Sequence, residues 1–214
     1  MNQITPVESD PDVKVFAEMP VLIDSLGLSV GGVYQAYWWE QDIQSRVGNL
    51  IAARHSEVAN IGIGLGLSLA ALESAGVTNI LAVDVLKDIC SREKNGRREA
   101  AGTKIVCADW LALCQKGELN SYAALYVDAF PIYNSFSYSR AEFDEIFCGI
   151  LLHLTKAKYK GMIYFLSFEP SSQGTSSPSE LPLDRELVTP VPQKISDHAL
   201  LDAVLYSTQL SFSQ

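Results

Sequence analysis

The sequence predicts an α/β fold in which a mostly parallel central sheet carries helices on both faces. Three observations predict it. A turn rich in glycine joins a short apolar run to a helical one, apolar runs of strand length alternate with helical segments, and aspartates end three successive runs. Strands separated by helical segments imply parallel pairing through right-handed crossovers.

The glycine-rich turn follows the apolar lead-in at Val58 and contains Gly62, Gly64 and Gly66. A strand that ends in glycines and turns directly into a helix leaves backbone N–H groups free and lets a ligand approach closely. In an α/β sheet, this first turn is the usual place for a nucleotide-like cofactor. Tight packing of a strand against a helix without any ligand gives the same spacing, so that alternative stays open.

The remaining elements follow from apolar runs and helical spacing. An amphipathic helix is expected over residues 38–53. Strands are expected at 58–62, 79–84, 104–107, 122–128 and 161–168, and helices at 66–75, 86–99, 109–115 and 139–156. The basic residues of 86–99 predict a solvated helix face. In the tail we expect a flexible loop or lid at 170–182, a helix at 197–205 and a last strand at 205–212.

Two parts of unequal size are expected. Residues 1–30 predict an N-terminal arm or lid, because their first 20 positions are acidic, contain three prolines and are typical of loose structure. Residues 31–214 predict a single domain.

Composition limits the function classes. The 214 residues are 48% hydrophobic and carry a formal net charge of −9, which repels phosphate backbones and disfavours a nucleic-acid partner. Four cysteines without a C-x-x-C pair and three scattered histidines predict no metal site. With no signal-peptide pattern and no apolar run of membrane length, we expect a cytoplasmic protein and no membrane partner.

Carboxylates follow three successive strands, at Asp84, Asp109 and Asp128. Because ligands in open α/β sheets bind outside the carboxyl ends of the strands, we expect the three to converge. Asp84 lies at the distance from the glycines where an acid holds a ribose diol, although a helix N-cap would explain it too. Asp109 can accept from the amine of adenine, and Trp110 offers a flat surface or, alternatively, a core side chain.

These features together resemble the class I S-adenosylmethionine (SAM)-dependent methyltransferases, which have a Rossmann-like fold. More narrowly, the chain resembles guanidinoacetate N-methyltransferase and its relatives. In that family a Trp-Glu pair precedes the glycine-rich strand and an aspartate–aromatic–proline turn follows the fourth strand. Here these read Trp39-Glu40 and Asp128-Ala129-Phe130-Pro131. The resemblance extends from about Tyr34 to Phe168.

The resemblance implies SAM as the cofactor. The glycines would line the methionine and ribose portions of the cofactor. Asp84 would hold the ribose hydroxyls, and Asp109 with Trp110 would flank the adenine. Asn60 stands where methyltransferases commonly carry an acid that holds the methionine ammonium group. The implied cofactor-binding set is Asn60, Gly62, Gly64, Gly66, Asp84, Asp109, Trp110 and Asp128.

On the acceptor side, Glu40 and Asp128 would be catalytic. A guanidinium or ammonium group is a cation with several donors, which carboxylates orient through charge-assisted hydrogen bonds. A nearby carboxylate can then accept the proton that the nitrogen must lose. Four aromatic side chains either surround the cation with their ring faces or pack in the core: Tyr34, Tyr37, Trp38 and Trp39. The implied substrate-binding set is Tyr34, Trp39, Glu40, Asp128, Phe130 and Tyr133.

The function expected from the sequence is therefore SAM-dependent N-methylation of a small cationic guanidino or amino metabolite. Two alternatives stay open: an aminopropyltransferase of the spermidine-synthase type, and a catalytically silent interaction subunit with a degenerate cofactor site. A small amine or guanidine is the expected partner molecule. Whether the protein is a homodimer is left open.

Overall fold

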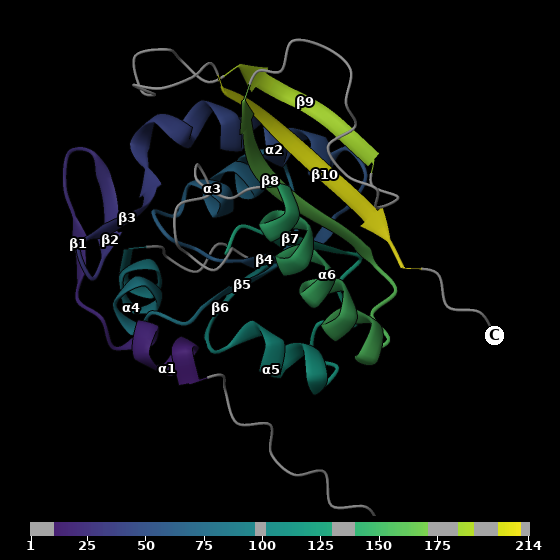
Figure 1. The fold of residues 1–214 in the computed structure, drawn as a ribbon, viewed down its shortest axis with the longest axis horizontal. Helices are drawn as coiled ribbons and strands as arrows, with labels where there is room; N and C mark the ends of the chain where they lie inside the picture. Colours follow the sequence, from purple (N-terminus) through teal and green to yellow (C-terminus); the bar gives the residue numbers. More distant parts are fainter. Residues whose placement is uncertain (1–10, 97–101, 130–139, 171–183, 191–200, 211–214) are drawn as a thin grey trace, which may run out of the picture.

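The computed structural model describes residues 11–96, 102–129, 140–170, 184–190 and 201–210, and it is built on one large sheet (Figure 1). Its seven strands lie in the spatial order β6 (Thr103–Cys107), β5 (Asn79–Asp84), β4 (Glu57–Ile61), β7 (Ala124–Val127), β8 (Met162–Pro170), β10 (Leu201–Gln209) and β9 (Asp184–Pro190). The first five run parallel to one another, whereas β10 is antiparallel to both of its neighbours. The predicted mostly parallel sheet is confirmed.

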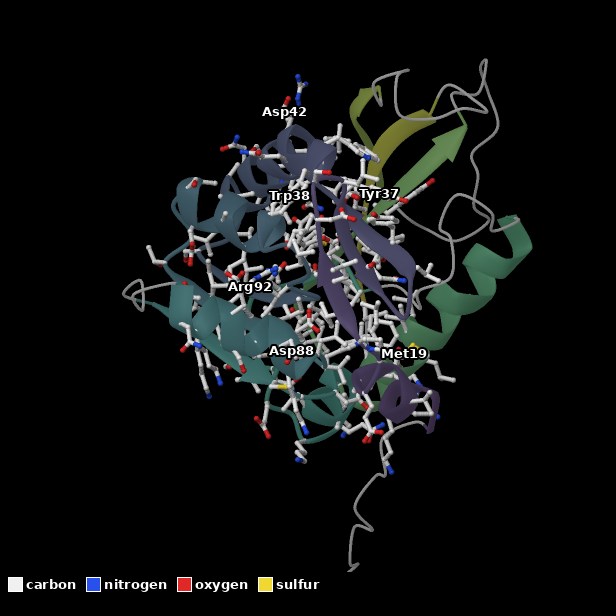
Figure 2. All side chains as sticks on the ribbon, turned by 90° about the vertical axis from the view of Figure 1, so that its left-hand side faces the viewer. Met19, Tyr37, Trp38, Asp42, Asp88 and Arg92 are labelled. Atoms are coloured by element: carbon white, nitrogen blue, oxygen red, sulfur yellow. The ribbon has the colours of Figure 1, made fainter. Side chains whose placement is uncertain are left out.

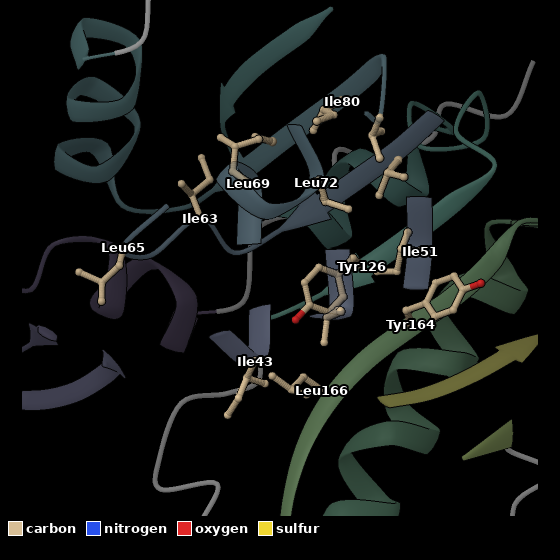
Figure 3. Close-up of a cluster of buried hydrophobic side chains, with 14 of the residues drawn as sticks. Ile43, Ile51, Ile63, Leu65, Leu69, Leu72, Ile80, Tyr126, Tyr164 and Leu166 are labelled. Atoms are coloured by element: carbon tan, nitrogen blue, oxygen red, sulfur yellow. The ribbon is translucent and has the colours of Figure 1, made fainter. Parts of the chain in front are cut away.

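Helices cover both faces of this sheet. One face packs on α2 (Gln41–Ala52), α3 (Leu67–Ser74) and α4 (Lys87–Gly96), and the other on α5 (Trp110–Gln115) and α6 (Arg140–Lys156). Side chains of β7 alternate between the two layers: Tyr126 lies in the first core cluster and its neighbours Leu125 and Val127 lie in the second. Figure 3 shows the first cluster around Tyr126. The sheet is therefore buried on both sides, as expected of parallel strands.

The N-terminal part forms a second, smaller sheet in front of the large one (Figure 2). The sheet consists of β1 (Val21–Ile23), β2 (Gly27–Val30) and β3 (Val33–Tyr37). The helix α1 (Pro11–Ala17) precedes it, and the short 3-10 helix η1 (Trp38–Glu40) follows it. Phe16, Leu28 and Val30 are buried in the first core cluster. These three residues anchor the described N-terminal elements to the main core, and β2 pairs with β3 across the expected boundary at residue 30. A lid role for residues 1–30 stays a prediction.

Every strand and helix expected between residues 58 and 168 is confirmed to within a few residues, and the expected helix at 38–53 forms as η1 followed by α2. The helix expected at 197–205 is wrong for residues 201–205, because residues 201–209 form β10, whereas the last strand expected at 205–212 is confirmed for residues 205–209. β9 was not anticipated. In β10 the buried Leu205 and Tyr206 pack on opposite faces of the sheet, and this tertiary burial outweighs local helix propensity. The expected loop lies outside the described residues, apart from Pro170, which ends β8.

In the part of the chain that the structure describes, no helix is both long enough and apolar enough to span a bilayer.

Helices α2 and α3 pack closely against each other at Gly48 of α2, which has no side chain. A Cβ atom built on Gly48 would lie 2.8 Å from the carbonyl carbon of Ala71 and 2.9 Å from its Cβ. Real Cβ atoms do not approach backbone atoms this closely, so glycine at this position sets the distance between the two helices.

Gly48→Ala should therefore lower the free energy of unfolding by about 1–3 kcal/mol, because the added methyl group overpacks the crossing. Gly149→Ala is the matched control, since Gly149 lies within α6 with open space around its Cβ position. That change should raise stability by up to about 1 kcal/mol through helix propensity. Urea unfolding curves measure both, and equal effects of the two variants would contradict the close crossing.

Candidate functional site

The order of the strands makes the region between β4 and β7 the candidate site. From β4 the chain builds outward through β5 and β6, and then returns to the other side of β4 with β7 and β8. At such a switch point the loops at the carboxyl ends diverge, which is where ligands bind in open α/β sheets. The backbone N–H of Asp128 donates to the carbonyl of Ile61 at 2.8 Å and so holds the turn after β7 beside the turn after β4.

The glycine-rich turn adopts a backbone that other residues rarely adopt. Gly62, Gly64 and Gly66 have φ angles of +86°, +51° and +82°. A Cβ on Gly62 would lie 2.6 Å from the carbonyl oxygen of Asp128, and one on Gly66 would lie 3.0 Å from a carboxylate oxygen of Glu93. Packing therefore accounts for these two glycines. At Gly64 the nearest atom is the Cβ of Ala36 at 3.7 Å, so the backbone there is the more open one.

Asp84 fixes this turn to the end of β5. Its Oδ2 accepts hydrogen bonds from the N–H groups of Ile63 at 2.9 Å and Gly64 at 3.2 Å, and its Oδ1 accepts from Leu86 at 2.9 Å. The contact with Leu86 agrees with the capping alternative. Because a carboxylate has about four acceptor positions, capacity for one more donor is left. The ribose role stays a prediction.

Arg92 and Glu93 of α4 also hold the turn, and the sequence did not single them out. The guanidinium of Arg92 donates to the carbonyl of Gly64 at 2.6 Å and pairs with Glu93 at 2.8 Å. Figure 2 shows Arg92 between α4 and the N-terminal strands. The basic residues of this helix were interpreted as a solvated face, and for Arg92 that interpretation is wrong.

Asn60 presents a buried acceptor next to the turn. Its side-chain nitrogen donates to the hydroxyl of Ser68 at 3.1 Å and to the carbonyl of Gly62 at 3.4 Å. Its Oδ1 is fully buried and has no hydrogen-bond partner among the described residues. An unsatisfied buried acceptor is costly, so this oxygen is suited to a donor from a ligand.

Asp109 and Trp110 lie at the start of α5. Asp109 is the N-cap, with its Oδ1 accepting from the N–H of Leu111 at 2.9 Å, which leaves Oδ2 for other donors. Trp110 is partly buried against the second core cluster. Their predicted contacts with adenine stay predictions. Phe130 and Tyr133, predicted to contact the acceptor, lie outside the described residues.

Glu40 and Asp128, which were predicted to form an acid pair, lie close enough to interact electrostatically. Desolvation and, to a smaller extent, the negative charge of Asp128 together raise the pKa of Glu40 to about 8, against the opposing effect of a hydrogen bond from the N–H of Tyr37 at 2.9 Å. Desolvation likewise raises the pKa of Asp128 to about 7, although the residue as a whole is exposed. Carboxyl groups with strongly raised pKa values are common at functional sites.

Gln44 and Tyr126 complete this acidic cluster, and the sequence reasoning missed both. The amide nitrogen of Gln44 donates to Oδ2 of Asp128 at 2.9 Å, and its amide oxygen accepts from the Tyr126 hydroxyl at 2.8 Å. Both side chains are buried. A signal for Gln44 was present, because it is polar but lies beside Ile43 on the buried face of α2, one helical turn after Glu40.

The aromatic residues before Glu40 divide into two groups. Tyr34, Tyr37 and Trp39 form a stacked row, with ring centroids 5.4 Å and 5.9 Å apart. Trp38 is 40% exposed, and its indole N–H donates to the backbone carbonyl of Asp24 at 2.8 Å. Contact of Tyr34 and Trp39 with a substrate stays a prediction. Within the described residues, no group of three or more His, Cys, Asp or Glu side chains is placed to hold a metal ion.

The acid pair makes stability depend on pH. A carboxyl group with a raised pKa binds its proton more tightly in the folded than in the unfolded protein, so stability falls as the pH rises from about 4 through 8. Replacing Glu40 with Gln should flatten this fall in urea unfolding measured between pH 5 and 9. Asp42→Asn, at an exposed position of α2, is the control and should keep the wild-type curve. A wild-type slope in the Glu40→Gln variant would contradict the raised pKa.

Comparison with known proteins identifies the fold. No family model and no curated protein matches the sequence. Among solved structures, "a putative sam-dependent methyltransferase from Streptococcus mutans" matches with a TM-score of 0.54 and 13% identity, over 89% of this chain and 56% of that one. A "putative methyltransferase complexed with SAH" matches with a TM-score of 0.52 and 12% identity, over 94% and 57%.

A third solved structure, the spermidine synthase from Thermotoga maritima, matches with a TM-score of 0.52 and 12% identity, over 85% of this chain and 64% of that one. The chain thus spans less than two thirds of each of these three structures. Nothing in the comparisons points to guanidinoacetate N-methyltransferase specifically. Strand order, helical layers and neighbours agree that this chain has the α/β, Rossmann-like fold of the class I methyltransferases.

Proposed function

We propose that this protein is a SAM-dependent methyltransferase that acts on a nitrogen atom of a small cationic guanidino or amino compound. The observation that carries the proposal is the interaction of Glu40 with Asp128 beside the glycine-rich turn, at the switch point of the sheet. The neighbour of similar fold that was solved with SAH supports the choice of cofactor.

The residues at the turn fit the cofactor. The unpartnered Oδ1 of Asn60 would accept a hydrogen bond from the ammonium group of the cofactor. Asp84 would accept one from a ribose hydroxyl, and Oδ2 of Asp109 would accept one from the adenine amine. The more open backbone at Gly64 would let the ligand approach. The cofactor would supply a methyl group on a positively charged sulfur atom, whose bond to carbon breaks with both electrons remaining on sulfur.

The acid pair would prepare the acceptor. Glu40 and Asp128 orient a multi-donor cation through charge-assisted hydrogen bonds, and the arriving positive charge lowers the pKa of both carboxyl groups. One carboxylate then takes a proton from the nitrogen, which keeps the electron pair and can form the new bond to carbon. Holding the nitrogen in line with the methyl group supplies much of the rate. No covalent intermediate with the protein is needed.

Two alternatives use the same site. Aminopropyl transfer would suit the acid pair equally well, because a polyamine is also a cation, and the solved spermidine synthase shares the fold. Against it, Leu67 and Ser68 follow Gly66 where such enzymes normally carry an acid. A catalytically silent subunit is favoured by one feature, namely Asn60 in place of an acid.

Calorimetric titration with SAM and with decarboxylated SAM separates these functions. We expect SAM to bind more tightly, and Asp84→Ala to weaken binding by about 1–3 kcal/mol through the loss of buried hydrogen bonds. Because Asp84 also holds the glycine-rich turn, the unfolding of this variant must be measured beside it. Asp88→Ala, at an exposed position of α4, is the matched control and should bind as the wild type does.

The outcomes of the titration are distinct. Absence of SAM binding would favour the silent subunit and overturn the proposal. Tighter binding of decarboxylated SAM would favour aminopropyl transfer. Unchanged affinity in a folded Asp84→Ala variant would remove Asp84 from the ribose site.

Asp128→Asn should depress turnover far more than cofactor binding, because an amide cannot accept the proton. We expect at least a ~100-fold loss of turnover, the usual contribution of a positioned base. The assay incubates the protein and methyl-labelled SAM with a panel of guanidines and amines and detects methylated products by mass. Asp42→Asn serves as the control. Turnover that survived in Asp128→Asn would show that the proposed acid pair is wrong.

A further inference from the structure

Gln44 occupies an unusual place for an amide. It lies on α2 among the buried residues Ile43, Val47 and Ile51, and only 2% of its surface is exposed. An amide in such surroundings is tolerated when its donors and acceptor find partners. Both ends of the Gln44 amide do so, and one of the partners is the proposed base.

The three side chains form a directed chain of hydrogen bonds. Tyr126 is buried, which raises the pKa of its hydroxyl, so the hydroxyl keeps its proton and can donate to the amide oxygen of Gln44. With the oxygen of Gln44 turned toward Tyr126, its nitrogen faces Oδ2 of Asp128 and must act as the donor there. In this arrangement Oδ2 accepts a hydrogen bond, and Oδ1 is the oxygen left to carry a proton.

The backbone of Asp128 is held as well. Its N–H donates to Ile61 at 2.8 Å, and β7 pairs with β4 immediately before it. With the main chain fixed from one side and Oδ2 from the other, the rotation of the carboxyl group is defined. Gln44 is therefore placed to choose which oxygen faces the binding site.

We propose that Gln44, anchored by Tyr126, is a positioning residue that holds Asp128 by its Oδ2 and so makes Oδ1 the atom that takes the proton from the acceptor nitrogen. This inference rests on the proposed function. It goes beyond it in naming the oxygen and the buried pair that selects it.

The same contact keeps Asp128 ionisable near neutral pH. The hydrogen bond from Gln44 lowers the pKa of Asp128, whereas desolvation raises it. Among the described residues, the other titratable groups shown to interact with this carboxyl group are Glu40 from η1 and Tyr126 from β7. Without Gln44, nothing else described at Asp128 opposes the desolvation of its charged form.

Three variants test the inference. Gln44→Leu removes both hydrogen bonds at nearly constant volume, Tyr126→Phe removes only the anchor, and Gln41→Leu changes an exposed glutamine of the same helix as the matched control. The first readout is the titration midpoint of the Asp128 carboxyl carbon by NMR in the protein without ligands, assigned with Asp128→Asn. This readout does not depend on any enzymatic activity.

In Gln44→Leu we expect the midpoint to rise by about one pH unit or more, since a hydrogen bond to a charged group is lost. A smaller rise is expected in Tyr126→Phe and no change in Gln41→Leu. If Gln44→Leu does not fold, Tyr126→Phe carries the same test. An unchanged midpoint in the folded variants would overturn the positioning role.

The second readout is the pH dependence of turnover. The acid limb of the profile should move upward by the same amount in Gln44→Leu, so that activity lost at pH 7 is largely recovered near pH 9. A loss of activity that is equal at every pH would indicate a merely structural role and overturn the inference. If the midpoint moves but no guanidine or amine is ever methylated, the positioning of Asp128 stands and the proposed function fails.

Discussion

The structure depends most on the contact between the turn after β4 and the turn after β7. A Cβ atom at Gly62 would lie 2.6 Å from the carbonyl oxygen of Asp128, so only glycine permits the two backbones to approach this closely. The N–H of Asp128 completes the contact by donating to Ile61. This approach brings the carboxylate after β7 to the glycine-rich turn, and the switch in strand order opens the sheet edge above it.

A second constraint is electrostatic. Two carboxyl groups from distant parts of the chain share a poorly solvated place, and both hold their protons more tightly than free acids do. A folded protein keeps such a pair only if the rest of the structure makes up for its cost. The buried amide of Gln44 satisfies one oxygen of Asp128 without adding charge.

The two halves of the site come from different parts of the fold. The acceptors around the glycine-rich turn belong to the large sheet and to α3, α4 and α5, whereas Glu40 follows directly on the small N-terminal sheet. That sheet packs on the same core, and Ala36 of β3 lies beside Gly64. The position of Glu40 therefore depends on the pairing of β2 with β3 as much as on the helix that follows it.

The sequence by itself determined the alternating core from residue 58 to 168, because strand and helix periodicities and the glycines of the turn are local signals. It also selected Glu40 and Asp128, which the fold brings near each other, while their catalytic role stays a prediction. Only the tertiary structure decided that Phe16, Leu28 and Val30 anchor the N-terminal elements to the core, that residues 201–204 join the last strand, and that Gln44 and Arg92 form hydrogen bonds at the site. Each of these contacts depends on partners far along the chain: the local pattern marks Gln44 as a polar residue on a buried helix face, but it does not identify Asp128 as its partner.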